Sequence, residues 1–176
     1  MQIQLFDLIS SEGKALHEMV QLESENFTFR DGSFQILKNE PFELTITNTG
    51  DKVLELTGTG RITVEIPCDR CLKPVKTEIE FDIERKLDMK LTDEERKEDL
   101  DECTYLNGTD LDVDQLVYLE VLMNWPLKVL CKKNCKGICS QCGKNLNDGS
   151  CTCADEPKDP RMAAISDIFR KFKEEV

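Results

Sequence analysis

The cysteines near the carboxyl end of this 176-residue chain are the residues whose type and spacing are best suited to binding a metal ion. Cys139 and Cys142 lie two residues apart and Gly143 follows them, which is the pattern of a metal-binding knuckle. Glycine lets the backbone amides of such a loop turn toward sulfur. Cys151 and Cys153 complete a C-x-x-C-x8-C-x-C pattern, because the turn at 145–149 can fold them back. Four thiolates at about 2.3 Å from one ion make a tetrahedral zinc site, and we predict one here.

Four further cysteines indicate a second site. Cys131 and Cys135 precede the first group, and Cys68 and Cys71 form a distant C-x-x-C pair. Grouped together, these four would hold a second zinc ion and pin the metal module to the rest of the chain. The expected cofactor is therefore zinc, as one or two ions. Cys103 is left over, and we expect an ordinary thiol there.

Disulfides, free thiols and iron–sulfur ligation are the alternatives to zinc. The first residues contain neither a positively charged segment nor a long apolar run, so we expect no export signal. A reducing, cytoplasmic compartment then favours metal binding over disulfides. The chain also lacks a run of eighteen apolar residues, so we expect no membrane span.

No catalytic motif is visible. The P-loop, the G-x-G-x-x-G loop, the nucleophile elbow and H-E-x-x-H are all absent. Catalytic zinc sites usually include a histidine or carboxylate ligand, and the only histidine, His17, lies where we expect a surface helix. The Cys68–Cys71 pair lacks the βαβ context of a thioredoxin-like redox motif. We therefore predict a protein that is not an enzyme and has no small-molecule substrate.

Charge is distributed unevenly along the chain. Residues 1–124 carry 13 basic and 28 acidic side chains, a net −15, whereas residues 125–176 carry 10 and 7, a net +3. Five lysines and no carboxylate lie between positions 128 and 144. These lysines either offset the negative charge of a four-thiolate zinc centre or form a surface that contacts phosphate. The sequence leaves both interpretations open.

The elements that must position the cysteines are mostly strands. Alternating apolar and polar residues predict strands at 42–47, 53–66 and 75–83, and a hairpin between 27 and 37 turning at Asp31-Gly32. Successive short strands with brief turns indicate an α+β protein whose body is an antiparallel β-barrel or sandwich. An aspartate at 112 or 114 should open a helix near 112–124, which ends before Pro126.

Three segments follow from these elements. A mainly β body with one helix covers 1–127, and a cysteine-rich metal-binding module, a small zinc knuckle, covers 128–154. A C-terminal helix at 155–176, with Asp159 as its cap, should pack on the body.

Several motifs taken in order resemble those of one family. They are Pro67-Cys68-Asp69-Arg70-Cys71-Leu72, the stretch 111–117 leading to Asn124-Trp125-Pro126, the cysteine cluster at 131–153 and Asp159-Pro160-Arg161. Together, from about residue 40 to 170, they resemble the YceD family of bacterial and plastid large-ribosomal-RNA accumulation proteins. Some members keep the C-x-R-C pair without the carboxyl-terminal cluster. The grouping of the second site and a metal count of none, one or two therefore stay open.

The resemblance implies a non-catalytic cytoplasmic factor in large ribosomal subunit biogenesis that promotes accumulation of large-subunit rRNA. It would bind rRNA or a pre-ribosomal particle, and the candidate RNA-binding residues are Arg70, Lys73, Lys76, Lys128, Lys132, Lys133, Lys136 and Lys144. Trp125 is the only aromatic residue near them, and we expect it in the core. The acidic remainder of the chain favours an alternative, an escort for a basic zinc-ribbon ribosomal protein of the large subunit. A structural zinc module with a protein-only regulatory partner is a third reading.

Overall fold

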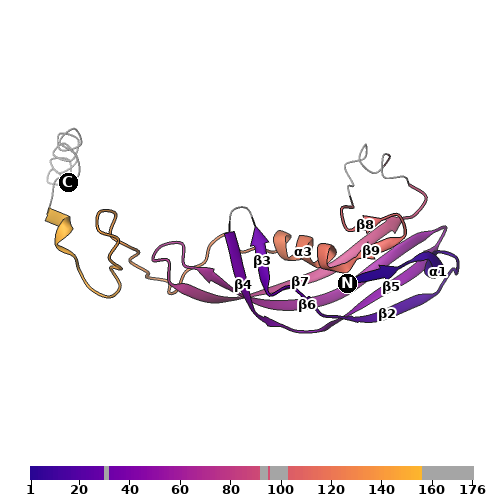
Figure 1. Ribbon diagram of the computed structural model, residues 1–176, viewed down its shortest axis with the longest axis horizontal. Helices are drawn as coiled ribbons and strands as arrows, with labels where there is room; N and C mark the ends of the chain where they lie inside the picture. Colours follow the sequence, from indigo (N-terminus) through magenta and orange to yellow (C-terminus); the bar gives the residue numbers. More distant parts are fainter. Residues whose placement is uncertain (30–31, 92–94, 96–102, 156–176) are drawn as a thin grey trace, which may run out of the picture. The chain divides into compact units, whose positions relative to one another are not determined.

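Three long strands arise from the alternating residues between 42 and 88. β5 spans Phe42–Gly50, β6 spans Val53–Pro67 and β7 spans Pro74–Asp88. Buried apolar residues alternate with more exposed neighbours along most of each strand, as the two-residue period of a strand requires. The computed structural model (Figure 1) thus confirms the three strands predicted here and extends each of them.

The structure describes residues 1–29, 32–91, 95 and 103–155. It divides into two units: the first contains Met1–Pro67 and Pro74–Val129, and the second contains Cys68–Lys73 and the chain from Leu130 on. The second unit therefore includes the cysteine-rich module together with the loop that joins β6 to β7. The C-terminal helix expected at 155–176 lies almost wholly outside the described residues.

The main sheet of the first unit is antiparallel and is organised around β6. β7 pairs with one edge of β6 over its full length, from Val53↔Asp88 to Pro67↔Pro74. The other edge is shared, because β5 pairs with its first half and β4 (Gly32–Asn39) with its second half. β2 (Ala15–Val20) pairs with β5, and β3 (Asn26–Phe29) pairs with β4 in the expected hairpin. The strand pairs among the described residues do not form a ring, so a closed barrel is not shown.

A smaller sheet and two helices complete the described part of the first unit. β1 (Gln2–Gln4), β9 (Asp110–Asp112) and β8 (Leu106–Asn107) pair in that order, and α1 is a single turn at Phe6–Ile9. The predicted helix is α3, Val113–Met123. Its N-cap is Asp112, whose Oδ1 accepts a hydrogen bond from the amide of Gln115 at 3.1 Å.

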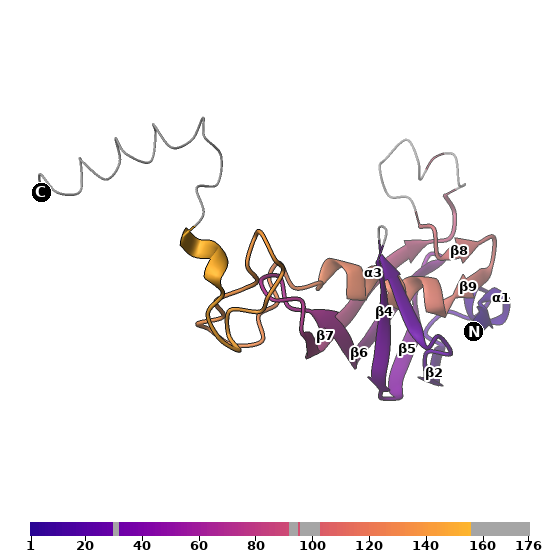
Figure 2. The ribbon, with the colours of Figure 1, turned by 60° about the vertical axis from the view of Figure 1, so that its left-hand side comes forward.

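Helix α3 packs on the sheet through its apolar face (Figures 1 and 2). Leu116, Val117 and Val121 are fully buried in one hydrophobic core with the inward residues of β5, β6 and β7. Glu120 is also buried, and Arg85 of β7 neutralises it by donating from Nε at 2.8 Å. This pair satisfies a charge that would otherwise be costly to bury.

Two features of the first unit bear on the sequence-based expectations. Trp125 packs in the core region as expected, with its ring stacked on Phe27 at 5.1 Å. The surface helix expected around His17 is wrong, because His17 lies on strand β2. Ala15, Leu16 and Met19 are good helix formers, but six residues of this segment pair with β5, and sheet pairing overrides the local preference.

None of the helices among the described residues combines the length and the apolar character needed to cross a bilayer.

Candidate metal centre

The loop between β6 and β7 is the first of two matched knuckles. The amide of Leu72 donates to the carbonyl of Cys68 at 2.9 Å, and the amide of Cys68 donates to the carbonyl of Lys73 at 2.8 Å. These bonds close the loop Cys68–Lys73 and place Cys68 and Cys71 on the same side of it. Leu72 takes a left-handed conformation, with φ of 60°.

The second knuckle, Cys139–Lys144, repeats this pattern. The amide of Gly143 donates to the carbonyl of Cys139 at 2.9 Å, and the amide of Cys139 donates to the carbonyl of Lys144 at 2.8 Å. Gly143 has φ of 71°, so it occupies the position that Leu72 occupies in the first knuckle. A backbone built this way offers two sulfurs to one ion, with amides directed at them, as from Gln141 to Cys139 Sγ at 3.5 Å.

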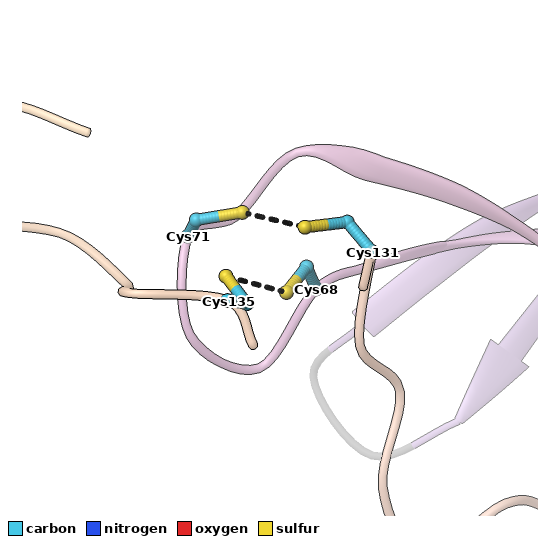
Figure 3. A group of neighbouring side chains, drawn as sticks. All are labelled: Cys68, Cys71, Cys131 and Cys135. Atoms are coloured by element: carbon cyan, nitrogen blue, oxygen red, sulfur yellow. Dashed lines mark hydrogen bonds between the residues drawn. The ribbon is translucent and has the colours of Figure 1, made fainter. Parts of the chain in front are cut away.

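Cys68, Cys71, Cys131 and Cys135, called site 1 from here on, converge in the second unit (Figure 3). All four sulfurs lie within 4.8 Å of one another. Cys68 Sγ is 3.8 Å from Cys135 Sγ, and Cys71 Sγ is 3.4 Å from Cys131 Sγ. A tetrahedron of sulfurs at about 2.3 Å from a central zinc ion has edges of about 3.8 Å, so the donor set fits the ion.

Cys139, Cys142, Cys151 and Cys153, called site 2, also lie with their sulfurs within 4.8 Å of one another. The turn between the two halves of this site is held by two hydrogen bonds to Asn145. Its Oδ1 accepts from the amide of Asn147 at 2.9 Å, and its carbonyl accepts from the amide of Asp148 at 3.2 Å. All nine cysteines of the chain are free thiols in the structure. The two groups predicted from spacing are therefore the two groups that the fold brings together.

The knuckle amides prepare one sulfur of each site for metal binding. At Cys68 burial opposes ionisation, but hydrogen bonds from the backbone of Cys131, Arg70 and Cys71 outweigh it and lower the pKa to about 6. At Cys139 the amides of Cys142 and Gln141 lower the pKa to about 6. Both sulfurs are thus mostly thiolate at neutral pH, which is the form that binds a metal.

A second sulfur in each site keeps its proton. A hydrogen bond with the Cys71 thiol raises the pKa of Cys131 to about 12, and burial adds to the effect. A hydrogen bond with Cys142 raises the pKa of Cys153 to about 11 in the same way. An ion entering either site must therefore expel at least one proton.

Four sulfur donors without histidine or carboxylate suit a closed structural site rather than a catalytic one with an open position. When bound, a metal would supply the cross-link that holds these loops, because no described residue of the second unit belongs to the hydrophobic core cluster or packs against it. The structure fixes the donor set, and the identity of the metal remains a prediction.

The candidate RNA-binding residues fall into three groups in the structure. Arg70 donates to the carbonyl of Cys135 at 2.9 Å, Lys73 pairs with Asp148 at 3.0 Å, and Lys144 donates to the carbonyl of Ser150 at 2.8 Å. These three cations hold the second unit together. Lys132, Lys133 and Lys136 are exposed, and no hydrogen bond or ion pair of their side chains is seen within the described part of the chain. Lys76 and Lys128 belong to the first unit.

Two site residues were not recognised from the sequence. Leu72 holds the left-handed position that glycine fills in the second knuckle, and no local signal marks a leucine for that role. Asn147 donates from Nδ2 to Cys135 Sγ at 3.3 Å, although the sequence indicated only that it lies in a turn. An asparagine between two pairs of ligands is a weak signal for such a bond.

The fold and the sites define a β-sheet protein joined to a unit with two four-cysteine centres. The family model for the large ribosomal RNA subunit accumulation protein YceD matches residues 56–169. The chain belongs to this family, so the resemblance seen in the sequence is confirmed.

Curated relatives match over part of their length. The Arabidopsis thaliana protein named large ribosomal RNA subunit accumulation protein YCED homolog 1, chloroplastic, is 31% identical over 62 residues, which cover 35% of this chain and 18% of the relative. Uncharacterized proteins of Mycobacterium bovis and Mycobacterium tuberculosis are each 28% identical over 135 residues, which cover 72% of this chain and 60% of the relative. The chain thus spans less than two thirds of these relatives. No solved structure matches it at a significant level.

Proposed function

We propose that this protein is a non-catalytic, cytoplasmic factor in large ribosomal subunit biogenesis. It promotes accumulation of large-subunit rRNA by binding that rRNA or a pre-ribosomal particle, and zinc in both sites holds its binding surface. Membership of the YceD family and the name of the Arabidopsis relative support the link to large-subunit rRNA.

The observation that favours direct RNA binding is the exposure of three lysine side chains, Lys132, Lys133 and Lys136. They are exposed and unpaired within the described residues, and two of them lie between the ligands Cys131 and Cys135. Phosphate contacts need cationic side chains that are not already bonded within the protein, and each contact that forms releases counterions from the RNA.

The net charge of the second unit is not by itself evidence for RNA binding. The described residues of the second unit contain six basic and three acidic side chains, a formal +3. Two zinc ions with four thiolates each contribute about −4 in total, so the loaded unit is close to neutral. Arg70, Lys73 and Lys144 make bonds within the unit. The three outward lysines are the ones that remain for phosphate.

The escort role has its own structural support. The outward face of β7 presents a row of exposed carboxylates, Glu78, Glu80, Asp82 and Glu84. Only Glu80 has a salt bridge among the described residues, with Arg61. Such a row suits a basic protein segment by charge complementarity.

The test is binding of the full-length, zinc-loaded protein to in vitro transcribed large-subunit rRNA across a series of salt concentrations. Replacing Lys132, Lys133 and Lys136 with glutamine should reduce the slope of log affinity against log salt by about 2. It should also weaken binding about fiftyfold near 0.15 M salt, because about 0.7 counterion is lost per contact. The matched control replaces Lys14, Lys86 and Lys90 of the first unit, which removes the same charge.

Equal binding by the two triple variants would contradict direct contact through the metal module. If the protein bound no rRNA but captured a basic ribosomal protein from pre-ribosomal particles, the escort role would replace the first proposal. Changing Glu78, Asp82 and Glu84 to lysine should then abolish that capture.

A further inference from the structure

One side chain connects the two cysteine sites. Asn147 lies in the loop that joins Cys142 to Cys151, so its backbone belongs to site 2. Its side chain is directed at site 1: Nδ2 donates to Cys135 Sγ at 3.3 Å, and Oδ1 accepts from the amide of Lys136 at 3.0 Å. Both ends of the amide group are therefore engaged by the Cys135 segment.

The loop that carries Asn147 is itself attached to this segment. The amide of Leu146 donates to the carbonyl of Gly137 at 2.9 Å, and Ile138 and Asn145 form an antiparallel bridge. Asn145 also orients Asn147, since its Oδ1 accepts from Asn147 Nδ2 at 2.8 Å. The position of Asn147 is thus fixed only when the site 2 loop and the Cys135 segment are both in place.

We propose that Asn147 couples the two sites, so that an ion bound at one strengthens binding at the other. An ion in site 1 fixes the position of Cys135 and of the segment that follows it, to which Asn147 bonds through Cys135 Sγ and the amide of Lys136. These bonds order the loop between Cys142 and Cys151 before site 2 closes, which lowers the entropy cost of closure. Coupling of this kind is reciprocal, so site 2 strengthens site 1 by the same factor.

The inference rests on the proposed loading of both sites with metal. Its test uses the full-length, reduced, metal-free protein titrated with Co²⁺ against a competing chelator, with thiolate-to-cobalt absorption as the readout. Site 1 is disabled by Cys71→Ser and Cys131→Ser, which leave the Cys135 sulfur in place. We expect this change to weaken site 2 about tenfold in the presence of Asn147, and by less than about twofold in an Asn147→Ala background.

A second substitution tests whether the coupling depends on the N–H to sulfur bond of Asn147 or only on its contact with Lys136. Asn147→Asp keeps an oxygen that can accept from Lys136 but places a negative charge beside the Cys135 sulfur. If the N–H to sulfur bond is what matters, Asn147→Asp should lose the coupling as Asn147→Ala does, although it keeps the contact with Lys136. Asn134→Ala is the matched control, because Asn134 is an exposed asparagine between ligands of site 1 and should leave both affinities unchanged.

The outcomes are distinct. Two ions bound, with site 2 indifferent to the loss of site 1, would overturn the coupling and leave the metal sites standing. An equal loss in the Asn147 and Asn147→Ala backgrounds would overturn the role of Asn147, and an Asp variant that keeps the coupling would overturn the role of its N–H to sulfur bond. Uptake of fewer than two ions would overturn the coupling together with the proposed metal sites.

Discussion

Replacing Gly143 with alanine should weaken metal binding at site 2 about five- to thirtyfold. Gly143 has φ of 71°, and a methyl group added there would meet no atom within 4 Å. The substitution therefore changes backbone strain without changing packing. A left-handed conformation costs an L-residue about 1–2 kcal/mol, and every 1.4 kcal/mol corresponds to about a tenfold change in affinity.

The assay is competition for zinc between the full-length protein and a chelator of known affinity. Ser140→Ala is the control inside the same knuckle, because it alters an exposed side chain without asking for a left-handed backbone. Leu72→Gly in the first knuckle should not weaken metal binding at site 1. Leu72 already carries the strain at φ of 60° and its side chain is 63% exposed, so glycine should leave site 1 as tight or tighter. An alanine variant of Gly143 that binds zinc normally would refute the proposed role of the knuckle backbone.

Two further predictions concern acidity and the core. Metal affinity of both sites should rise at least tenfold per pH unit between pH 6 and 8. Cys131 and Cys153, with pKa values of about 12 and 11, must each release a proton when the metal binds. Chelator competition at several pH values measures this affinity, and a flat profile would contradict the prediction. Gly60→Ala should destabilise the first unit by about 1–3 kcal/mol, since the added methyl would overlap the buried ring of Phe81. Urea unfolding followed by fluorescence of the single tryptophan, Trp125, would show this loss, and Phe81→Leu in the same chain should recover part of it.

The sequence predicted the long strands well because each has enough alternating residues to define a period. β5, β6 and β7 contain between 9 and 15 residues, and one face of each is buried. Short elements lack this signal. β1, β8 and β9 have three residues or fewer, so no periodicity could mark them. Their pairing is a consequence of tertiary packing.

Helix α3 was predicted because its start and end both have local causes. Asp112 caps its first turn, and Pro126 follows soon after its last residue. The prediction for the segment of strand β2 was wrong for the opposite reason. Its residues favour a helix, and its partner strand, β5, lies more than twenty residues away in the sequence. The buried ion pair of Glu120 with Arg85 likewise joins residues far apart in the sequence, so no local pattern identifies it.

The cysteine pairs could be predicted because a knuckle contributes two sulfurs to one ion, but the sequence left open which pairs share an ion. Loop entropy could not have chosen which pairs combine, since closing a loop of about sixty residues costs only about 2 kcal/mol more than closing one of eight. The short spacer between Cys135 and Cys139 decides the matter in the structure. Its amides and carbonyls bond to neighbouring loops, from Ile138 to the carbonyl of Arg70 at 3.1 Å and from Leu146 to Gly137 at 2.9 Å. A spacer used in this way cannot fold back to bring Cys135 and Cys139 to one ion, and the two sites follow from that constraint.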